Sequence, residues 1–199
     1  MGKTKNELVD TARILFAKNG FEATTMNEIA TVSGKGRRTL YSYFSSKEEI
    51  YVAVIQNELE RLSARMAEVA QQELPPEKKI TTLFMSHLEF VKETVTRNGN
   101  LRAEFFRDIW KVESVRKNFD RNEIILFRRV MNEGNDRGVF DIRNVKLMAR
   151  ITHYCLKGCE VPYIFGRFGV ASPEELYPYI FRMVTRMYGA DHDKDHFMY

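Results

Sequence analysis

The sequence predicts an all-α protein of about nine helices. Apolar residues recur at helical spacing along nearly all of the 199 residues, and no alternating run of strand length interrupts them. At four expected helix starts a Ser or Thr stands three residues before a Glu, which is the spacing of the capping box. These four residues are Thr4, Thr25, Ser46 and Ser172. Glycines and prolines separate the periodic segments, which supports helices joined by short turns.

The first part of the chain is predicted to form a small three-helix domain, residues 1–47. Its helices are expected over residues 5–19, 26–32 and 37–43. Gly34 and Gly36 lie between the second and third helices and allow a tight turn. Leu40 and Phe44, four residues apart, are expected to bury against Ile29 and the first helix. Two short helices joined by a glycine-bearing turn, with a support helix before them, describe a helix-turn-helix.

The rest of the chain, residues 48–199, is predicted to form a second helical domain. Its helices are expected over residues 46–72, 77–97, 113–134, 144–162 and 174–188, with a short one from Leu101 to Ile109. Pro178 lies inside the last segment, where a kink or a late helix start is expected. The scattered Asp and Glu side chains are expected on surface faces of these helices.

Composition argues against several classes of protein. No apolar run approaches the roughly 18 residues of a membrane span, and the first residues lack the apolar stretch of a secretory signal. Two cysteines make no disulfide framework. No phosphate-binding loop, nucleophile elbow or pair of catalytic carboxylates is present. We therefore expect a cytoplasmic protein with no enzymatic activity and no cofactor.

Basic and hydrogen-bonding side chains gather in the predicted helix-turn-helix. The net charge of +4 permits nucleic-acid binding without requiring it, but residues 33–47 carry four cations and no acid. A recognition helix presents such groups to base edges and phosphates in the major groove. The candidates for reading bases are Arg37, Arg38, Thr39 and Ser42, and those for phosphates are Thr25, Tyr41, Tyr43 and Lys47, with Lys35 in the turn. The alternative is a solvated basic turn.

An ordered set of short motifs runs from residue 8 to residue 50. It comprises Leu15-Phe16-Ala17, Gly20-Phe21, Ala23-Thr24-Thr25, Glu28-Ile29-Ala30, Thr39-Leu40-Tyr41, Tyr43-Phe44 and Ser46-Lys47-Glu48-Glu49. Together these motifs resemble the N-terminal DNA-binding domain of TetR-type (tetracycline-repressor-like) transcriptional regulators. The turn departs from the family pattern, because a glycine replaces the usual capping serine and Arg38 replaces a small residue.

The resemblance implies a dimeric transcriptional repressor that binds a palindromic double-stranded DNA operator. It also implies a helical C-terminal domain that dimerises through its last two long helices and often encloses a ligand pocket. Three alternatives remain: an activator without a small-molecule effector, a helical interaction protein that uses the basic turn for an acidic partner, and an all-helical enzyme.

Aromatic side chains in the second domain are candidates for the lining of an effector pocket. They are Phe84, His87, Phe105, Phe106, Trp110, Phe127, Tyr154 and Tyr163. Apolar residues at helical spacing also pack as an ordinary core, which is the alternative for the whole set. If the set lines a pocket, the expected effector is apolar or aromatic.

Two pairs of residues have the spacing of a metal or redox pair. Cys155 and Cys159 lie four apart on one expected helix, and His192 and His196 lie four apart near the C-terminus. Buried packing is expected for the cysteines and a solvated tail for the histidines, because neither pair has a third ligand nearby in sequence. No metal site is expected.

Overall fold

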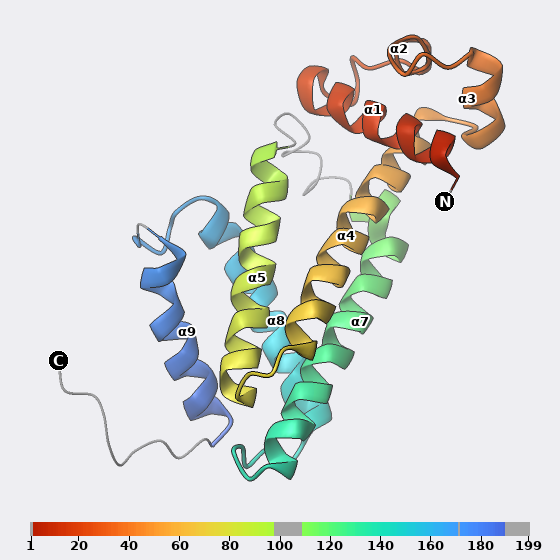
Figure 1. Cartoon of the computed structure of the whole chain (residues 1–199). Helices are drawn as coiled ribbons and strands as arrows, with labels where there is room; N and C mark the ends of the chain where they lie inside the picture. The colour runs from red at the N-terminus through yellow and green to blue at the C-terminus, as the bar shows by residue number, and fades with distance from the viewer. Residues whose placement is uncertain (1, 98–108, 171, 190–199) are drawn as a thin grey trace. The chain divides into compact units, whose positions relative to one another are not determined.

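The computed structural model describes residues 2–97, 109–170 and 172–189, and the side chains of all of these except residues 109–114. This part of the chain contains eight α-helices and no strand (Figure 1), which confirms the all-α fold. The helices are α1 (Lys3–Asn19), α2 (Met26–Val32), α3 (Arg37–Tyr43), α4 (Lys47–Gln71), α5 (Pro76–Arg97), α7 (Ile109–Asp136), α8 (Val145–Ile164) and α9 (Pro173–Met187). The predicted short helix from Leu101 to Ile109 lies outside the described residues, apart from Ile109 itself.

Two of the four predicted capping residues cap helices. The Thr25 hydroxyl accepts a hydrogen bond from the backbone N–H of Glu28 at 3.1 Å, and the Ser46 hydroxyl accepts one from that of Glu49 at 3.2 Å. In both cases the glutamate binds elsewhere, Glu28 to the Asn19 amide and Glu49 to Ser45. Each cap therefore satisfies one orphan amide donor and leaves the carboxylate for a neighbouring segment.

The other two capping predictions are wrong. Helix α1 already begins at Lys3, after Gly2, so Thr4 lies inside the helix. Ser172 does stand at the N-cap of α9, but its side chain makes no capping hydrogen bond. The capping-box pattern identifies a helix start, but it does not by itself fix which hydroxyl bonds to the backbone.

Of the two alternatives predicted for the last helix, a kink at Pro178 or a late start, the late start is wrong. Helix α9 begins at Pro173, five residues before Pro178, and continues through it. Proline is favoured in the first turn of a helix, where its missing N–H has no intrahelical acceptor. Pro178 lacks only the bond that its N–H would make to the carbonyl of Glu174, at the very start of the helix.

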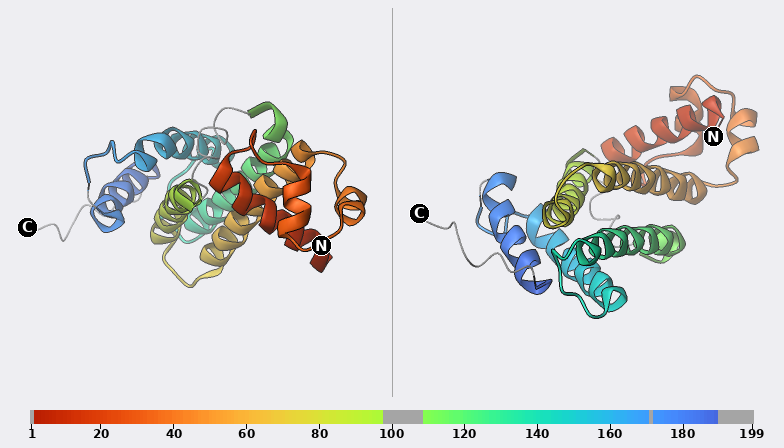
Figure 2. Two further views of the ribbon diagram at one scale, coloured as in Figure 1. Left: turned by 90° about the horizontal axis from the view of Figure 1, so that it is seen from above. Right: turned by 60° about the horizontal axis from the view of Figure 1, so that its bottom comes forward.

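The chain divides into two compact units: Met1–Arg61 with Glu93–Phe119, and Leu62–Lys92 with Asp120–Tyr199. In the first unit α1, α2 and α3 lie against one another and beside the start of α4 (Figure 2). Leu40 is the one buried side chain of α3, and with Ile29 and Phe44 it joins the core under α1, as predicted. Burying a side chain of this size contributes about 1.5–3 kcal/mol, so Leu40 anchors the short helix.

The turn between α2 and α3 is a Schellman motif. Gly34 follows the last residues of α2 with φ 66°, in the left-handed region that favours glycine. The N–H of Gly34 donates to the carbonyl of Thr31 and that of Lys35 to the carbonyl of Ala30, each at 3.1 Å. Gly36 instead has φ −66°, which any residue adopts. Of the two glycines, only Gly34 is required by the conformation of the turn.

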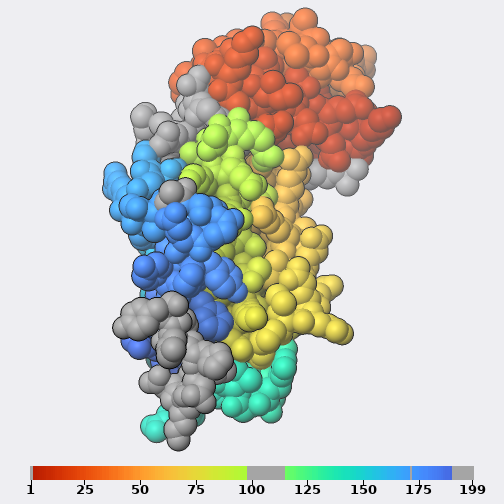
Figure 3. Space-filling model, turned by 60° about the vertical axis from the view of Figure 1, so that its left-hand side comes forward, coloured from red at the N-terminus to blue at the C-terminus, as the bar shows by residue number. Residues whose placement is uncertain are grey.

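The second unit is a helical bundle that comprises the end of α4 from Leu62, α5 as far as Lys92, α7 from Asp120, α8 and α9. Phe84, Leu88, Phe127 and Leu156 are among its fully buried side chains. Tyr188 ties the end of α9 to α8, since its hydroxyl and that of Thr152 are 2.6 Å apart. Helix α9 lies beside α5 and forms a broad part of the surface in Figure 3. On this helix Tyr179 and Met183 are exposed.

We predict that Gly34→Ala lowers the free energy of unfolding by about 1–2 kcal/mol, because alanine is disfavoured in the left-handed region. No atom stands within 4 Å of the added methyl group, so the cost comes from the backbone alone. Gly36→Ala is the matched control: Gly36 is the N-cap of α3 at an ordinary φ, where glycine is preferred to alanine, and the substitution should cost less than Gly34→Ala, about 0.5 kcal/mol. Chemical denaturation of the three proteins measures both values. Equal effects at the two glycines would contradict the assignment of the turn.

Candidate functional site

Helix α3 presents almost all of its surface to solvent. Arg37, Arg38, Tyr41, Ser42 and Tyr43 are exposed. The Arg37 guanidinium lies over the Tyr41 ring, 5.9 Å from its centroid. The seven-residue helix contains no carboxylate. A short helix with cations at its N-terminal end and hydroxyl groups along its outer face can contact an anionic polymer with a grooved surface.

The hydroxyl groups predicted to contact DNA make local bonds in the unbound chain. Ser42 donates to the carbonyl of Thr39 at 2.7 Å, and the Thr25 hydroxyl caps α2. Thr39 is half-buried at the inner edge of the helix. A hydroxyl group that donates one hydrogen bond keeps its acceptor capacity, so Ser42 can still accept a bond from outside.

The two lysines of the predicted set are bound within their own unit. The Lys35 ammonium lies 2.7 Å from Glu7 Oε2, and the hydrogen bond it donates lowers the pKa of that carboxyl. The Lys47 ammonium donates to the carbonyls of Phe21 at 2.7 Å and Glu22 at 3.1 Å, and it lies over the Phe21 ring. Both lysines therefore brace α1 and the loop after it, a role that the sequence did not reveal.

The predicted pocket residues divide into three groups. Phe84, His87, Phe127 and Tyr163 are buried in the bundle of the second unit. Tyr154 is 65% exposed on the outer face of α8, so the structure does not bring it to the others. Phe105 and Phe106 lie outside the described residues, and Trp110 belongs to α7 with its side chain outside them.

His87 lies at the centre of a buried chain of charges. Its Nδ1 is 2.5 Å from Glu123 Oε1 on α7, and its Nε2 is 2.8 Å from Glu160 Oε1 on α8. The second oxygen of Glu123 lies 2.6 Å from Nδ1 of His153, also on α8. Lys157 continues the chain towards the surface, with its ammonium 2.6 Å from Glu160. These contacts join α5, α7 and α8 by charged hydrogen bonds.

The carboxylates hold His87 in its protonated form. Burial alone would lower the pKa of His87, but the facing Glu123 and Glu160 outweigh it and raise the pKa to about 9. Burial would likewise raise the pKa of Glu123, yet His87 and His153 hold it below its ordinary value. The expectation that acidic residues lie on surface faces is thus wrong for Glu123 and Glu160. One signal was present: Glu123 stands four residues from both Phe119 and Phe127, on the buried face of α7.

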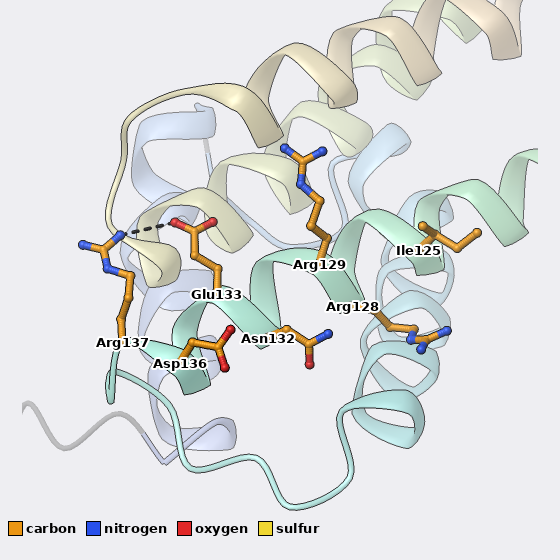
Figure 4. Close-up of a pocket in the computed structure, with 7 residues that line it drawn as sticks. All are labelled: Ile125, Arg128, Arg129, Asn132, Glu133, Asp136 and Arg137. Carbon is orange, nitrogen blue, oxygen red and sulfur yellow. Dashed lines mark hydrogen bonds and ion pairs between the residues drawn. The ribbon is translucent and has the colours of Figure 1, made fainter.

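Two hollows in the second unit contain few of the predicted pocket residues. One is an open furrow of about 610 Å³ along α7 (Figure 4), lined by Ile125, Arg128, Arg129, Asn132, Glu133, Asp136 and Arg137. The other has room for about 20 Å³ between Lys92, Tyr163 and the α8–α9 connection, which is about one water molecule. Tyr163 is the single predicted residue among these linings.

The cysteines differ from expectation. Cys155 is exposed on α8 and Cys159 is half-buried, so buried packing is wrong for Cys155. Burial raises the pKa of the Cys159 thiol. Within the described ranges no cluster of His, Cys, Asp or Glu has an arrangement suited to a metal ion. None of the helices described in Figure 1 is long and apolar enough to cross a bilayer.

A support helix, a glycine turn and a short, exposed, cationic helix define a helix-turn-helix protein of the DNA-binding class. Residues 8–54 match the family described as bacterial regulatory proteins, tetR family. The N-terminal part of the chain is therefore similar to the DNA-binding domain of TetR-type transcriptional regulators.

Similarity to known proteins extends beyond this domain. The HTH-type transcriptional regulator QacR of Staphylococcus aureus is 24% identical over 157 residues, which cover 77% of this chain and 82% of QacR. A TetR/AcrR-family regulator from Thermobifida fusca superposes with a TM-score of 0.71 at 20% identity, over 98% of this chain and 100% of that one. FadR from Bacillus subtilis, solved in complex with stearoyl-CoA, gives a TM-score of 0.66 at 15% identity, over 90% and 97% of the two chains.

We predict that the protein loses stability as the pH rises from 6.5 towards 9. The folded-state pKa of His87 is about 9 against 6.5 when unperturbed, so its contribution is full below pH 6.5 and disappears as the proton is lost. His87→Gln should abolish this slope and, at pH 6, cost about 3 kcal/mol, because Glu123 and Glu160 lose the buried cation between them and keep only His153 and Lys157. Arg137→Gln, in an exposed pair with Glu133, is the control and should cost less than about 1 kcal/mol. Urea denaturation across this pH range measures all three proteins, and a flat wild-type profile would refute the role of His87.

Proposed function

We propose that the chain is a dimeric transcriptional repressor that acts in the cytoplasm on a palindromic double-stranded DNA operator. Residues 1–47 are the DNA-binding domain, and residues 48–199 form the regulatory and dimerisation domain. A small apolar or aromatic ligand releases the repressor from DNA. The observation that carries this proposal is the exposure of the cationic face of α3, on a helix anchored by Leu40 alone.

The side chains of α3 divide between reading bases and binding phosphates. Arg37 and Arg38 stand in the first turn, from which a guanidinium can bond the two acceptors of a guanine in the major groove. Thr39 and Ser42 contact base edges nearby. Tyr41 and Tyr43, both exposed, offer phenolic hydroxyls to the phosphates on either side. Thr25, Lys35 and Lys47 contact phosphates from the flanking helix starts and the turn, which fixes the register without reading sequence.

Apolar surface on α8 and α9 supports dimerisation through these helices. Leu147, Ile151 and Tyr154 follow one another at i, i+4 and i+7 on α8 and are 52%, 41% and 65% exposed. Tyr179 and Met183 form a similar stripe on α9. The opposite faces of the two helices, including Leu156 and Ile180, are buried within their own unit. One apolar face of each helix thus packs within its own unit. The second, exposed face is available to a second copy of the chain.

Two observations support a ligand that is mainly apolar. The buried aromatic rings of Phe84, Phe127 and Tyr163 would meet such a ligand with apolar surface. The FadR structure from Bacillus subtilis contains stearoyl-CoA, whose acyl chain is apolar. A ligand releases DNA only if it binds the DNA-free conformation more tightly than the DNA-bound one.

We predict different effects for the arginines of α3 and for Lys47. Arg38→Ala should cost about 1–3 kcal/mol of DNA binding and relax the preference at one operator position. Lys47→Ala should weaken all duplexes alike and lower the salt slope of binding by about one. Selection from random duplexes, followed by fluorescence anisotropy at several salt concentrations, measures both effects. Arg137→Ala, in the second unit, is the control and should bind like the wild type.

The opposite pattern would overturn the assignment of these roles. In that case Lys47→Ala would alter the preferred sequence, and the arginine variants would not. Failure of unrelated duplex DNA to compete for the basic face, while an acidic protein does compete, would favour the interaction-module alternative instead.

We predict a homodimer that Ile151→Glu dissociates. Each dimer would bury two new carboxylates at its interface, one from each chain. This should weaken association by about 2 kcal/mol or more. Ile125→Glu is a matched control, because Ile125 is also exposed, at 51%, but lies on α7. Light scattering at micromolar concentration gives the mass of each protein. A monomeric wild type, or equal dissociation by both variants, would exclude the α8–α9 interface.

We predict that apolar or aromatic compounds raise the melting temperature, since a ligand that binds only the folded state stabilises it. A thermal-shift screen should include fatty acids, aromatic compounds and polyanionic metabolites as three separate arms. Trp110→Ala should reduce the shift caused by a hit. Stabilisation by polyanions alone, lost when Arg102 or Arg107 is replaced and retained in Trp110→Ala, would exclude an apolar effector.

A further inference from the structure

Glu58 is a buried carboxylate on α4 that faces arginines from three helices of the first unit. Its side chain is 1% exposed. Oε1 lies 3.9 Å from Nε of Arg13 on α1 and 3.8 Å from Nη1 of Arg61 on α4. Oε2 accepts a hydrogen bond from Nη2 of Arg97, in the last turn of α5. One carboxylate thus connects α1, α4 and the end of α5.

This junction differs from an ordinary surface ion pair. An exposed pair contributes little, because water screens both charges. A buried carboxylate is costly unless cations surround it, and the removal of one partner leaves that cost uncompensated. Arg61 also reaches Asp10 on α1, at 3.6 Å, which adds a second link between the same helices. The charges around Glu58 thus add directional contacts between α1 and α4 to the apolar packing of the two helices.

Helix α1 carries the rest of the DNA-binding domain with it. Phe16 of α1 packs on Phe21 and Tyr51, with ring centroids 5.5 and 6.0 Å apart. Lys35, in the turn before α3, is bound to Glu7 at the start of α1. The contacts of α1 with Phe21 and with Lys35 thus couple the orientation of α1 on α4 to the direction in which α3 points.

We propose that Glu58 is a positioning residue that orients the DNA-binding helices and thereby sets the spacing of operator half-sites that the dimer accepts. The proposal rests on the proposed function, since it requires a dimer on a two-part operator. Two recognition helices on one face of DNA must match half-sites about one helical turn apart. If the charges around Glu58 hold each α3 in one orientation, an operator lengthened or shortened by one base pair is rejected.

The test uses the full-length protein and duplexes recovered by selection from a random library, with one base pair added to or removed from the centre. The variants are Glu58→Gln and Arg97→Gln, and the latter changes a side chain that is 44% exposed and so spares the core. The control is Arg65→Gln, because Arg65 also joins α4 to α5, through Glu89 at 3.4 Å, but Glu89 lies outside this junction. Melting temperatures of all four proteins are recorded in parallel.

We expect the wild type and Arg65→Gln to prefer the selected spacing by about tenfold or more, in line with the cost of a misplaced contact. Glu58→Gln and Arg97→Gln should bind all three spacings within about threefold of one another. A purely structural role would instead lower the melting temperature and weaken all three duplexes equally, and that result would overturn the proposal. So would unchanged discrimination in Arg97→Gln. A wild type that selects no duplex at all would refute the proposed function itself.

Discussion

A carboxylate removed from water must be surrounded by cations or hydrogen-bond donors, and this constraint organises both units of the chain. In the first unit Glu58 draws arginines from α1, α4 and α5 to one point. In the second, Glu123 and Glu160 enclose His87 and join α5, α7 and α8. Apolar contacts contribute most of the burial, but they are non-directional. The charged contacts specify which helices meet, and at which residues.

The DNA-binding face follows the opposite rule. Its arginines stay in water, where a guanidinium retains its donors for a ligand, while the neighbouring lysines are engaged with Glu7 and with backbone carbonyls. The helix that carries the arginines keeps its place through Leu40 and through the glycine turn before it. A rigidly held helix with an exposed outer face suits recognition, because little conformational entropy is lost when a partner binds.

Periodicity and breakers sufficed to predict the helices, the helix-turn-helix and the burial of Leu40, since these depend on neighbours in sequence. The residues of the buried charge networks were harder to recognise. The spacing of Glu123 from Phe119 and Phe127 places it on the buried face of α7, but its partner His87 lies 36 positions away and the spacing does not identify it. The exposure of Tyr154 could not be predicted from the sequence either. Helix α8 has apolar residues on two faces, and the pattern does not show which face packs against the rest of the unit. The prediction that Thr4 caps α1 is wrong for a local reason, since the helix begins at Lys3, two residues earlier than predicted.

The charge network around His87 also constrains how the sequence can diverge. A lineage that replaces His87 alone removes the cation that Glu123 and Glu160 share, and one that replaces Glu123 alone leaves His87 and His153 without their shared acceptor. A single substitution at either His87 or Glu123 therefore lowers the free energy of unfolding, although a wholly apolar set of side chains of similar volume can be as stable. The members of the network should be inherited together or lost together, and descendants that have lost it will have passed through a less stable ancestor.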